Sequence, residues 1–153
     1  MLNLLGSFEC RIDPKGRLML PSYLKKQLEA IIEDGFIIKK NVFSKALELF
    51  PKNEWEIVAR DLAKLNKYQK ETQDFKRKFT AGFRMIEADN VGRILIPKEL
   101  LVYAEIKKDL VLVADENRIE IWARDNYMEV QEDSTLDYAK IADKLWGINK
   151  EGE

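Results

Sequence analysis

The chain has 153 residues, of which 46% are hydrophobic and 35% charged, and its formal net charge is −1. This length suits one compact domain or two small halves that share a core, and the neutral balance gives no global attraction to nucleic acid. The chain contains no histidine and one cysteine, Cys10, which excludes histidine-based catalysis, histidine- or cysteine-rich metal sites and an intrachain disulfide.

The N-terminal region predicts two strands joined by a turn. Residues 7–12 alternate apolar and polar side chains, which is typical of a half-buried strand. The sequence Asp13-Pro14-Lys15-Gly16 has the residues that turns require. Residues 18–20 predict a short second strand, and residues 22–32, which follow Pro21, predict a helix.

The next segment predicts two buried strands and two helices. Apolar runs at residues 36–38 and 46–50 indicate the strands. Pro51 starts a helix that we expect to end near residue 65. Residues 66–80 are polar and rich in lysine, with no glycine or proline, and therefore predict a linking helix.

The rest of the chain repeats this order and adds helices. The repeated strands are expected at residues 82–88, 94–96, 110–113 and 119–122. Two helices follow at residues 123–131 and 134–146, the second ended by Gly147. We therefore divide the chain into these parts: a first half (5–52) with its following helix to about 65, a linker helix (66–80), a second half (81–124) and C-terminal helices (125–147).

One motif occurs twice. Residues 13–21 and 89–97 have Asp, Gly, Arg and Pro at the same offsets, with three apolar residues between Arg and Pro in both copies. Such self-similarity indicates one supersecondary unit used twice. The sequence therefore predicts an α+β fold with internal pseudo-symmetry.

The two motifs also supply candidate binding residues. An arginine held by the aspartate four residues earlier loses less entropy when it binds a phosphate or a guanine edge. The same pair could instead be only a structural ion pair, and the two interpretations are compatible. The candidate DNA-binding residues are Arg17, Lys15, Arg93 and Arg11. The residues expected to shape and orient the turns are Asp13, Gly16, Asp89 and Gly92.

The second copy is less basic than the first. Val91 occupies the position that Lys15 has in the first turn. We therefore expect Arg93 to contribute less to DNA binding than Arg17.

Several classes of function are disfavoured by what the sequence lacks. No glycine-rich phosphate loop or nucleophile elbow accompanies the missing histidines, so we expect no enzyme, catalytic residue, metal, cofactor or small-molecule substrate. No apolar run approaches the roughly 20 residues of a membrane span. The lone cysteine suits a reducing compartment, and we expect a cytoplasmic protein without a membrane partner.

The motifs Gly16-Arg17-Leu18-Met19-Leu20-Pro21 and Gly92-Arg93-Ile94-Leu95-Ile96-Pro97 resemble the signature of the AbrB (SpoVT-AbrB) DNA-binding domain. Two such halves in one chain, each with a D-x-x-x-R turn, resemble the MraZ family of bacterial transcriptional regulators. The resemblance covers residues 1–146.

The resemblance implies two AbrB-like swapped-hairpin β-barrel halves related by a pseudo-twofold axis, with flanking helices. It implies a nucleoid-associated homo-oligomeric ring that binds short direct repeats in promoter DNA and represses its own division and cell-wall gene cluster. The family's functional residues fall on Asp13, Arg17, Asp89 and Arg93. The alternative is an antitoxin-like protein-interaction module of the same fold, without specific DNA recognition.

Overall fold

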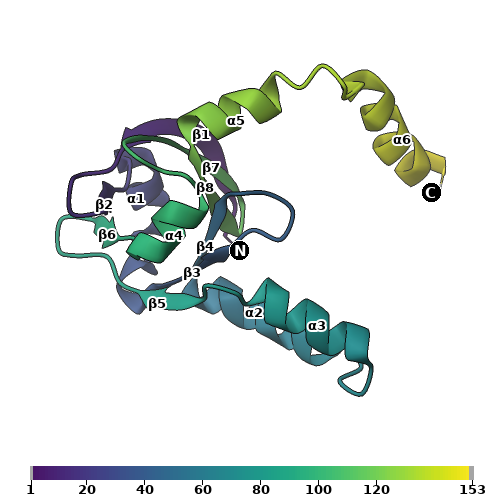
Figure 1. Cartoon of the computed structure of the whole chain (residues 1–153), viewed down its shortest axis with the longest axis horizontal. Helices are drawn as coiled ribbons and strands as arrows, with labels where there is room; N and C mark the ends of the chain where they lie inside the picture. Colours follow the sequence, from purple (N-terminus) through teal and green to yellow (C-terminus); the bar gives the residue numbers. More distant parts are fainter. Residues whose placement is uncertain (1, 152–153) are drawn as a thin grey trace.

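The computed structural model describes residues 2–151, and over residues 148–151 it describes only the backbone. The structure is mixed α+β, with helices at the margins of a central sheet (Figure 1). The strands are β1 (Leu4–Arg11), β2 (Arg17–Met19), β3 (Phe36–Lys40), β4 (Leu47–Pro51), β5 (Arg84–Ile86), β6 (Arg93–Leu95), β7 (Asp109–Glu116) and β8 (Arg118–Ala123). The helices are α1 (Ser22–Leu28), a short 3-10 helix (Ile32–Asp34), α2 (Lys52–Ala63), α3 (Lys70–Phe79), α4 (Lys98–Tyr103), α5 (Arg124–Gln131) and α6 (Tyr138–Glu151).

The two halves share one six-stranded sheet. Its strand order is β1-β7-β8-β4-β3-β5, and all neighbours are antiparallel. The first strand of each half pairs with a strand of the other half: β1 lies along β7, from Leu4 opposite Glu116 to Arg11 opposite Asp109, and β5 pairs with β3. Neither half therefore has a complete sheet of its own.

The duplicated motifs meet in a separate two-stranded ribbon. Strands β2 and β6 pair antiparallel, with Leu18 opposite Ile94 at the centre. Both central side chains are fully buried. The ribbon therefore lies on the pseudo-twofold relation between the halves, because each motif pairs with its own copy.

The core repeats the same pattern from both halves. Four pairs of residues at equivalent positions are buried: Leu18 and Ile94, Leu20 and Ile96, Leu24 and Leu100, and Leu28 and Ala104. These side chains belong to one continuous apolar cluster beneath the ribbon and helices α1 and α4. The apolar residues between each motif's arginine and proline thus anchor the ribbon to the body.

Aromatic side chains attach the helix after each half's last strand. Phe50 packs against Trp55 at 5.6 Å between ring centroids, and Trp122 packs against Tyr127 at 5.9 Å, both in an edge-on arrangement. Trp55 also stacks on Phe79 of α3 at 6.3 Å, which attaches α3 to α2.

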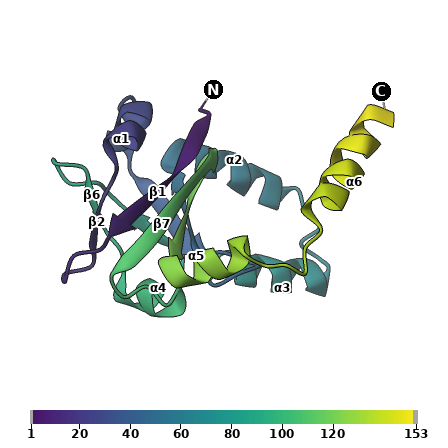
Figure 2. The same cartoon turned by 90° about the horizontal axis from the view of Figure 1, so that it is seen from above.

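The molecule has two distinct ends. The turns that follow β1 and β5 project from one end, and helices α2, α3 and α6 lie at the opposite end (Figures 1 and 2). Helix α6 stands clear of the sheet in both views. Over the described residues, no helix combines the length and apolarity that crossing a bilayer requires.

Two helices differ from the sequence-based expectation. The helix expected over residues 22–32 ends at Leu28 and is followed by the 3-10 turn. The last helix starts at Tyr138, because Asp133 accepts hydrogen bonds from Thr135 and holds the preceding residues in a turn. It also continues through Gly147 to Glu151, because a side chain there would meet no neighbour and the glycine does not adopt a positive φ.

Candidate nucleic-acid interface

Each duplicated turn is closed by its aspartate. In the first turn, Asp13 Oδ1 accepts hydrogen bonds from the backbone N–H groups of Lys15 (2.9 Å) and Arg17 (2.8 Å). In the second turn, Asp89 Oδ1 accepts from Val91 (3.1 Å) and Arg93 (2.8 Å). The two turns are built alike because each capping bond joins residues at most four positions apart.

The turn glycines adopt a conformation that other residues avoid. Gly16 has φ +85° and Gly92 has φ +88°, and each donates its N–H to the carbonyl of the turn's aspartate at 3.0 Å. Both carbonyls also join the two copies: Ile96 N–H donates to Gly16 O and Leu20 N–H donates to Gly92 O. Glycine is required here because an L side chain is strained at such φ values.

Each aspartate also orients its arginine. Arg17 Nε donates to Asp13 Oδ2 at 2.6 Å, and Arg93 Nε donates to Asp89 Oδ2 at 2.8 Å. Among the described residues, none accepts a hydrogen bond from the Nη groups of either arginine. About a third of each arginine side chain is exposed, 32% and 35% respectively. The ion pair thus fixes the guanidinium and leaves its far edge open to a phosphate or base.

The hydrogen bonds also keep both aspartates ionised. The backbone N–H of Arg17, then its side chain and the N–H of Lys15, lower the pKa of Asp13 against a small opposing effect of burial. The pKa of Asp89 is lowered by the corresponding groups, Arg93 first and then Val91. Both pairs therefore stay charged at neutral pH.

The ribbon presents a mixed basic and apolar outer face. Its pairs are Arg17 opposite Leu95 and Met19 opposite Arg93, and the side chains of these four residues share one face because side chains alternate along strands. Met19 is 44% exposed and Leu95 is 56% exposed, whereas the central pair points into the core. A two-stranded ribbon fits the major groove of B-DNA, where arginine binds guanine and apolar side chains contact thymine methyl groups.

The other predicted residues lie beside the first turn. Lys15 is exposed at the tip of that turn. Arg11 ends β1, and its Nε donates to Asp109 of the other half at 3.1 Å, with 72% of its side chain exposed. Arg11, Lys15 and Arg17 thus lie on one continuous stretch of β1, turn and β2 at the same end of the molecule.

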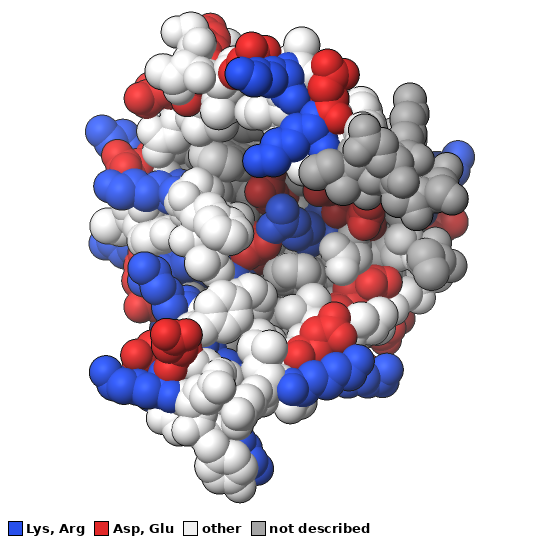
Figure 3. Space-filling view, turned by 90° about the vertical axis from the view of Figure 1, so that its right-hand side faces the viewer, with Lys and Arg blue, Asp and Glu red and all other residues white. Residues whose placement is uncertain are grey.

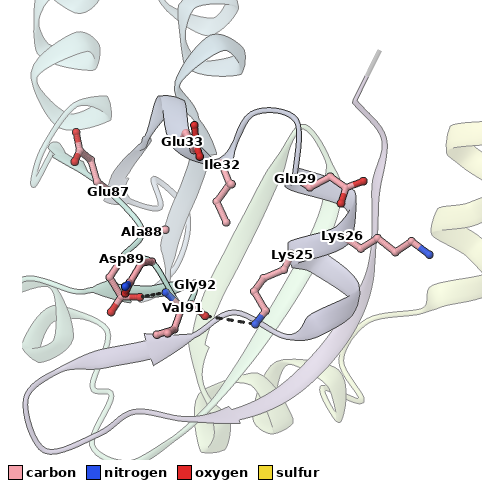
Figure 4. A pocket seen from close by; sticks show the side chains of 11 residues that line it. Lys25, Lys26, Glu29, Ile32, Glu33, Glu87, Ala88, Asp89, Val91 and Gly92 are labelled. Atoms are coloured by element: carbon pink, nitrogen blue, oxygen red, sulfur yellow. Dashed lines mark hydrogen bonds between the residues drawn. The ribbon is translucent and has the colours of Figure 1, made fainter.

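The structure brings one further basic residue to the second turn. Lys25 of α1 extends across the second turn, and its Nζ donates to Val91 O at 3.5 Å (Figure 4). Analysis of the sequence missed this residue because Lys25 and Val91 are 66 positions apart. The repeated motif carries no signal for it, since the equivalent residue of the second half is Leu101, which approaches Gly16.

The sequence matches one family model twice. The model is described as "MraZ protein, putative antitoxin-like", and it matches residues 4–78 and 79–147. The chain is also 47% identical over 147 residues to a protein of Christiangramia forsetii named Transcriptional regulator MraZ, with 96% of this chain and 95% of the relative covered. It is 46% identical to the protein of that name from Flavobacterium psychrophilum, with 96% and 94% covered. The protein of that name from Cytophaga hutchinsonii is 32% identical, with 95% of each chain covered.

Proposed function

Because this chain belongs to the MraZ family of transcriptional regulators and carries two MraZ repeats, we propose that it binds double-stranded DNA through its two D-x-x-x-R turns and the ribbon between them. The family is not enzymatic. The observation that carries the proposal is the pair of oriented guanidinium groups, Arg17 and Arg93, whose Nη groups bond to no described residue. Lys15 and Arg11 would add phosphate contacts beside the first turn.

The regulatory part of the proposal follows the family resemblance. The protein would bind short direct repeats in the promoter of its own division and cell-wall gene cluster and repress it, in the cytoplasm at the nucleoid. Repeated half-sites suit a protein whose single copy has few cations, because linked copies convert weak contacts into avidity of about 10²- to 10⁴-fold. Bending the DNA around several copies would cost a few kcal/mol, about 1–6, which the added contacts must offset.

The fold part of the proposal is the swapped-hairpin barrel of the AbrB family. It is supported by the exchange of β1 and β5 between the halves, together with the central ribbon. The proposed domain division, with halves at 5–52 and 81–124, would then separate two chain segments that share one sheet.

A ring needs a surface on which one copy can hold another, and α6 provides a candidate. Its apolar side chains are exposed, with Ile141 at 41% and Leu145 at 61%. At the same end of the molecule, Trp55, Ala59 and Leu62 line a mainly apolar groove of about 400 Å³ beside α3. We propose that the groove of one copy receives α6 of another.

Charge supports this pairing of two copies. The helices beside the groove are basic over residues 64–80, and the segment over residues 125–143 is acidic. The basic residues are Lys64, Lys67, Lys70, Lys76, Arg77 and Lys78; the acidic ones are Asp125, Glu129, Glu132, Asp133, Asp137 and Asp143. Figure 3 shows the face that carries both regions: it is hollowed between them, and charged side chains of both signs lie among uncharged ones. Opposite charges on two surfaces steer them together and fix their register.

The DNA proposal is tested by selecting genomic fragments on the purified protein. Wild-type protein should enrich a fragment from its own promoter region, and Arg17→Ala combined with Arg93→Ala should lose that enrichment in a gel-shift series at fixed salt. The control Arg77→Ala removes an exposed arginine from the opposite end, where it pairs with Asp74, and should bind like wild type.

Both negative outcomes are informative. Wild-type affinity in the double arginine variant would reject the turns as the contact surface. Co-purification of a stoichiometric foreign protein, with no DNA enriched, would favour the protein-interaction alternative.

A further inference from the structure

We infer that Lys25, which lies outside both motifs, completes a second DNA-phosphate contact at the Gly92 turn. This inference rests on the proposed function. It assigns to the second turn the lysine that its own sequence lacks, because Val91 stands where the first turn has Lys15. The cation comes from helix α1 of the other half.

The position of Lys25 is fixed by close packing. A Cβ built on Gly92 would lie 2.5 Å from Lys25 Cδ, so the lysine stem covers the glycine directly. The Nζ group then reaches Val91 O at 3.5 Å, at the tip of the turn. The ammonium is therefore held at the same turn that orients Arg93.

The ammonium also lies on the outer side of the ribbon. Lys25 Nζ is 4.0 Å from Met19 Sδ, and Met19 is the exposed residue opposite Arg93 in the ribbon. One cation from α1 and one from β6 therefore flank the same exposed methionine. A backbone phosphate beside a groove-bound ribbon would meet both charges.

The equivalent position in the first turn explains the arrangement. Gly16 is approached by Leu101, the counterpart of Lys25, and a Cβ there would lie 3.5 Å from Leu101 Cδ1. The first turn thus combines Arg17 with a lysine of its own, and the second combines Arg93 with a lysine from the opposite half. Each turn has one arginine and one lysine, although the motifs differ.

Acidic residues share the groove in which Lys25 lies but occupy its other end. The groove between α1 and the second turn is lined also by Glu29, Glu33 and Glu87. In Figure 4, Glu33 and Glu87 lie at the far side from the Lys25 ammonium, and Lys26 points away from the turn. Among the described residues, no carboxylate forms a salt bridge with Lys25, so its charge remains available to a phosphate.

The test measures how salt weakens DNA binding. Each phosphate contact to B-DNA adds about 0.9 to the slope of log affinity against log salt. Lys25→Met keeps an unbranched stem over Gly92 and removes the charge, so the slope should fall by about 0.9 for each copy in contact with DNA. Affinity between about 50 mM and about 200 mM salt should then fall about 3.5-fold less per contact than in wild type.

Matched variants isolate the charge at this position. Lys26→Met, on the next residue of the same helix, should leave the slope at the wild-type value. Lys15→Met should reduce it as much as Lys25→Met does, and Lys25→Arg should preserve it. The probes are a random-sequence duplex and the genomic duplex that the wild-type protein enriches most strongly, and each variant's thermal midpoint is recorded beside its slope.

The outcomes separate this inference from the proposed function. Equal slopes for Lys25→Met and Lys26→Met, with binding still lost in the double arginine variant, would overturn the role of Lys25 alone. A lowered thermal midpoint with an unchanged slope would make Lys25 a cover for the turn and would also overturn it. If wild-type protein binds neither duplex, the proposed function and this inference both fall.

Discussion

At the residue scale, the Asp–Arg pair is both a structural and a binding feature. Asp13 closes its turn through two backbone N–H groups and holds Arg17 through a third bond. A partly exposed pair of this kind stabilises a fold by only about 0–1 kcal/mol. Its larger effect is to keep the guanidinium in one orientation, which lowers the entropy lost on binding.

The same pair makes stability depend on pH in a defined direction. The pKa of Asp13 and of Asp89 is lower in the folded state than the ordinary value of about 3.9. A depressed pKa contributes stability that is fully present above the unfolded-state value and disappears as the pH falls through the folded-state value.

We expect the double variant Asp13→Asn, Asp89→Asn to be less stable than wild type at pH 7. The difference should begin to shrink below about pH 4 and vanish at lower pH, where both carboxyl groups are protonated in the wild type. Urea unfolding of both proteins across this range measures it, with Asp125→Asn on exposed α5 as the control. A difference that stays constant down to about pH 2 would contradict this cause.

At the element scale, the strands of the two halves are joined by a buried charge cluster. Lys39 of β3 is fully buried and donates from Nζ to Glu48 Oε1 of β4 at 2.7 Å. Glu48 also pairs with Arg118 of β8, from the other half. Burial lowers the pKa of Lys39, and Glu48 opposes that effect. Removing one partner of a buried pair leaves an uncompensated charge.

Glu48→Ala should therefore lower the free energy of unfolding by about 3–5 kcal/mol. Urea denaturation measures this loss, and the exposed substitution Glu56→Ala on α2 should change stability by no more than about 0.5 kcal/mol. Equal stability of the two variants would show that the cluster contributes no net stabilisation to the sheet.

Helix α6 is the element whose role depends on a second copy. Ile141 and Leu145 are four positions apart on one helical face and are exposed, so the single copy gains little from burying them. Replacing both with Ser should lower the mass of the protein in solution and leave the circular dichroism of the body intact. Light scattering after size exclusion measures the mass, and Lys144→Ser on the opposite face is the control. An unchanged mass in the double variant would reject α6 as the contact between copies.

At the scale of the whole molecule, the exchange of strands makes one folding unit of two repeats. The eight residues of β1 pair with β7, and β5 pairs with β3, so each half alone lacks a strand that its sheet needs. The apolar cluster likewise contains residues of both halves. The chain should unfold in a single cooperative transition.

Separate expression of residues 1–80 and 81–153 tests this unity. Neither piece should show a cooperative transition by circular dichroism, because unpaired strand edges and half of the apolar cluster would be exposed. Mixing or co-expressing the pieces should restore the transition. A cooperative transition in the first piece alone would show that one repeat is an independent domain.

The division of the molecule into two ends fits a regulator that assembles. The turns project at one end and the exposed α6 with the α2–α3 groove lies at the other, so one surface can meet DNA while the other meets another copy (Figures 1 and 2). The ring and its direct repeats would follow from this separation, because contacts between copies do not cover the turns.

The element order and the candidate arginines could be predicted from sequence because their causes are local. The alternation of residues 7–12, the prolines before the helices and the capping of each turn act over a few positions. The last helix was mispredicted at both ends, because Asp133 delays its start and Gly147 meets no neighbour that would end it. Local signals at helix ends compete closely, and tertiary contacts decide between them.

The amino-acid sequence by itself determined the duplicated turn, its glycine and its Asp–Arg pair, since all of these depend on bonds between residues at most four positions apart. Only the tertiary structure decided which strands pair across the halves and that Lys25 lies over the Gly92 turn. Those contacts join residues far apart in the chain, and burial of the shared apolar cluster, which no local pattern encodes, brings them together.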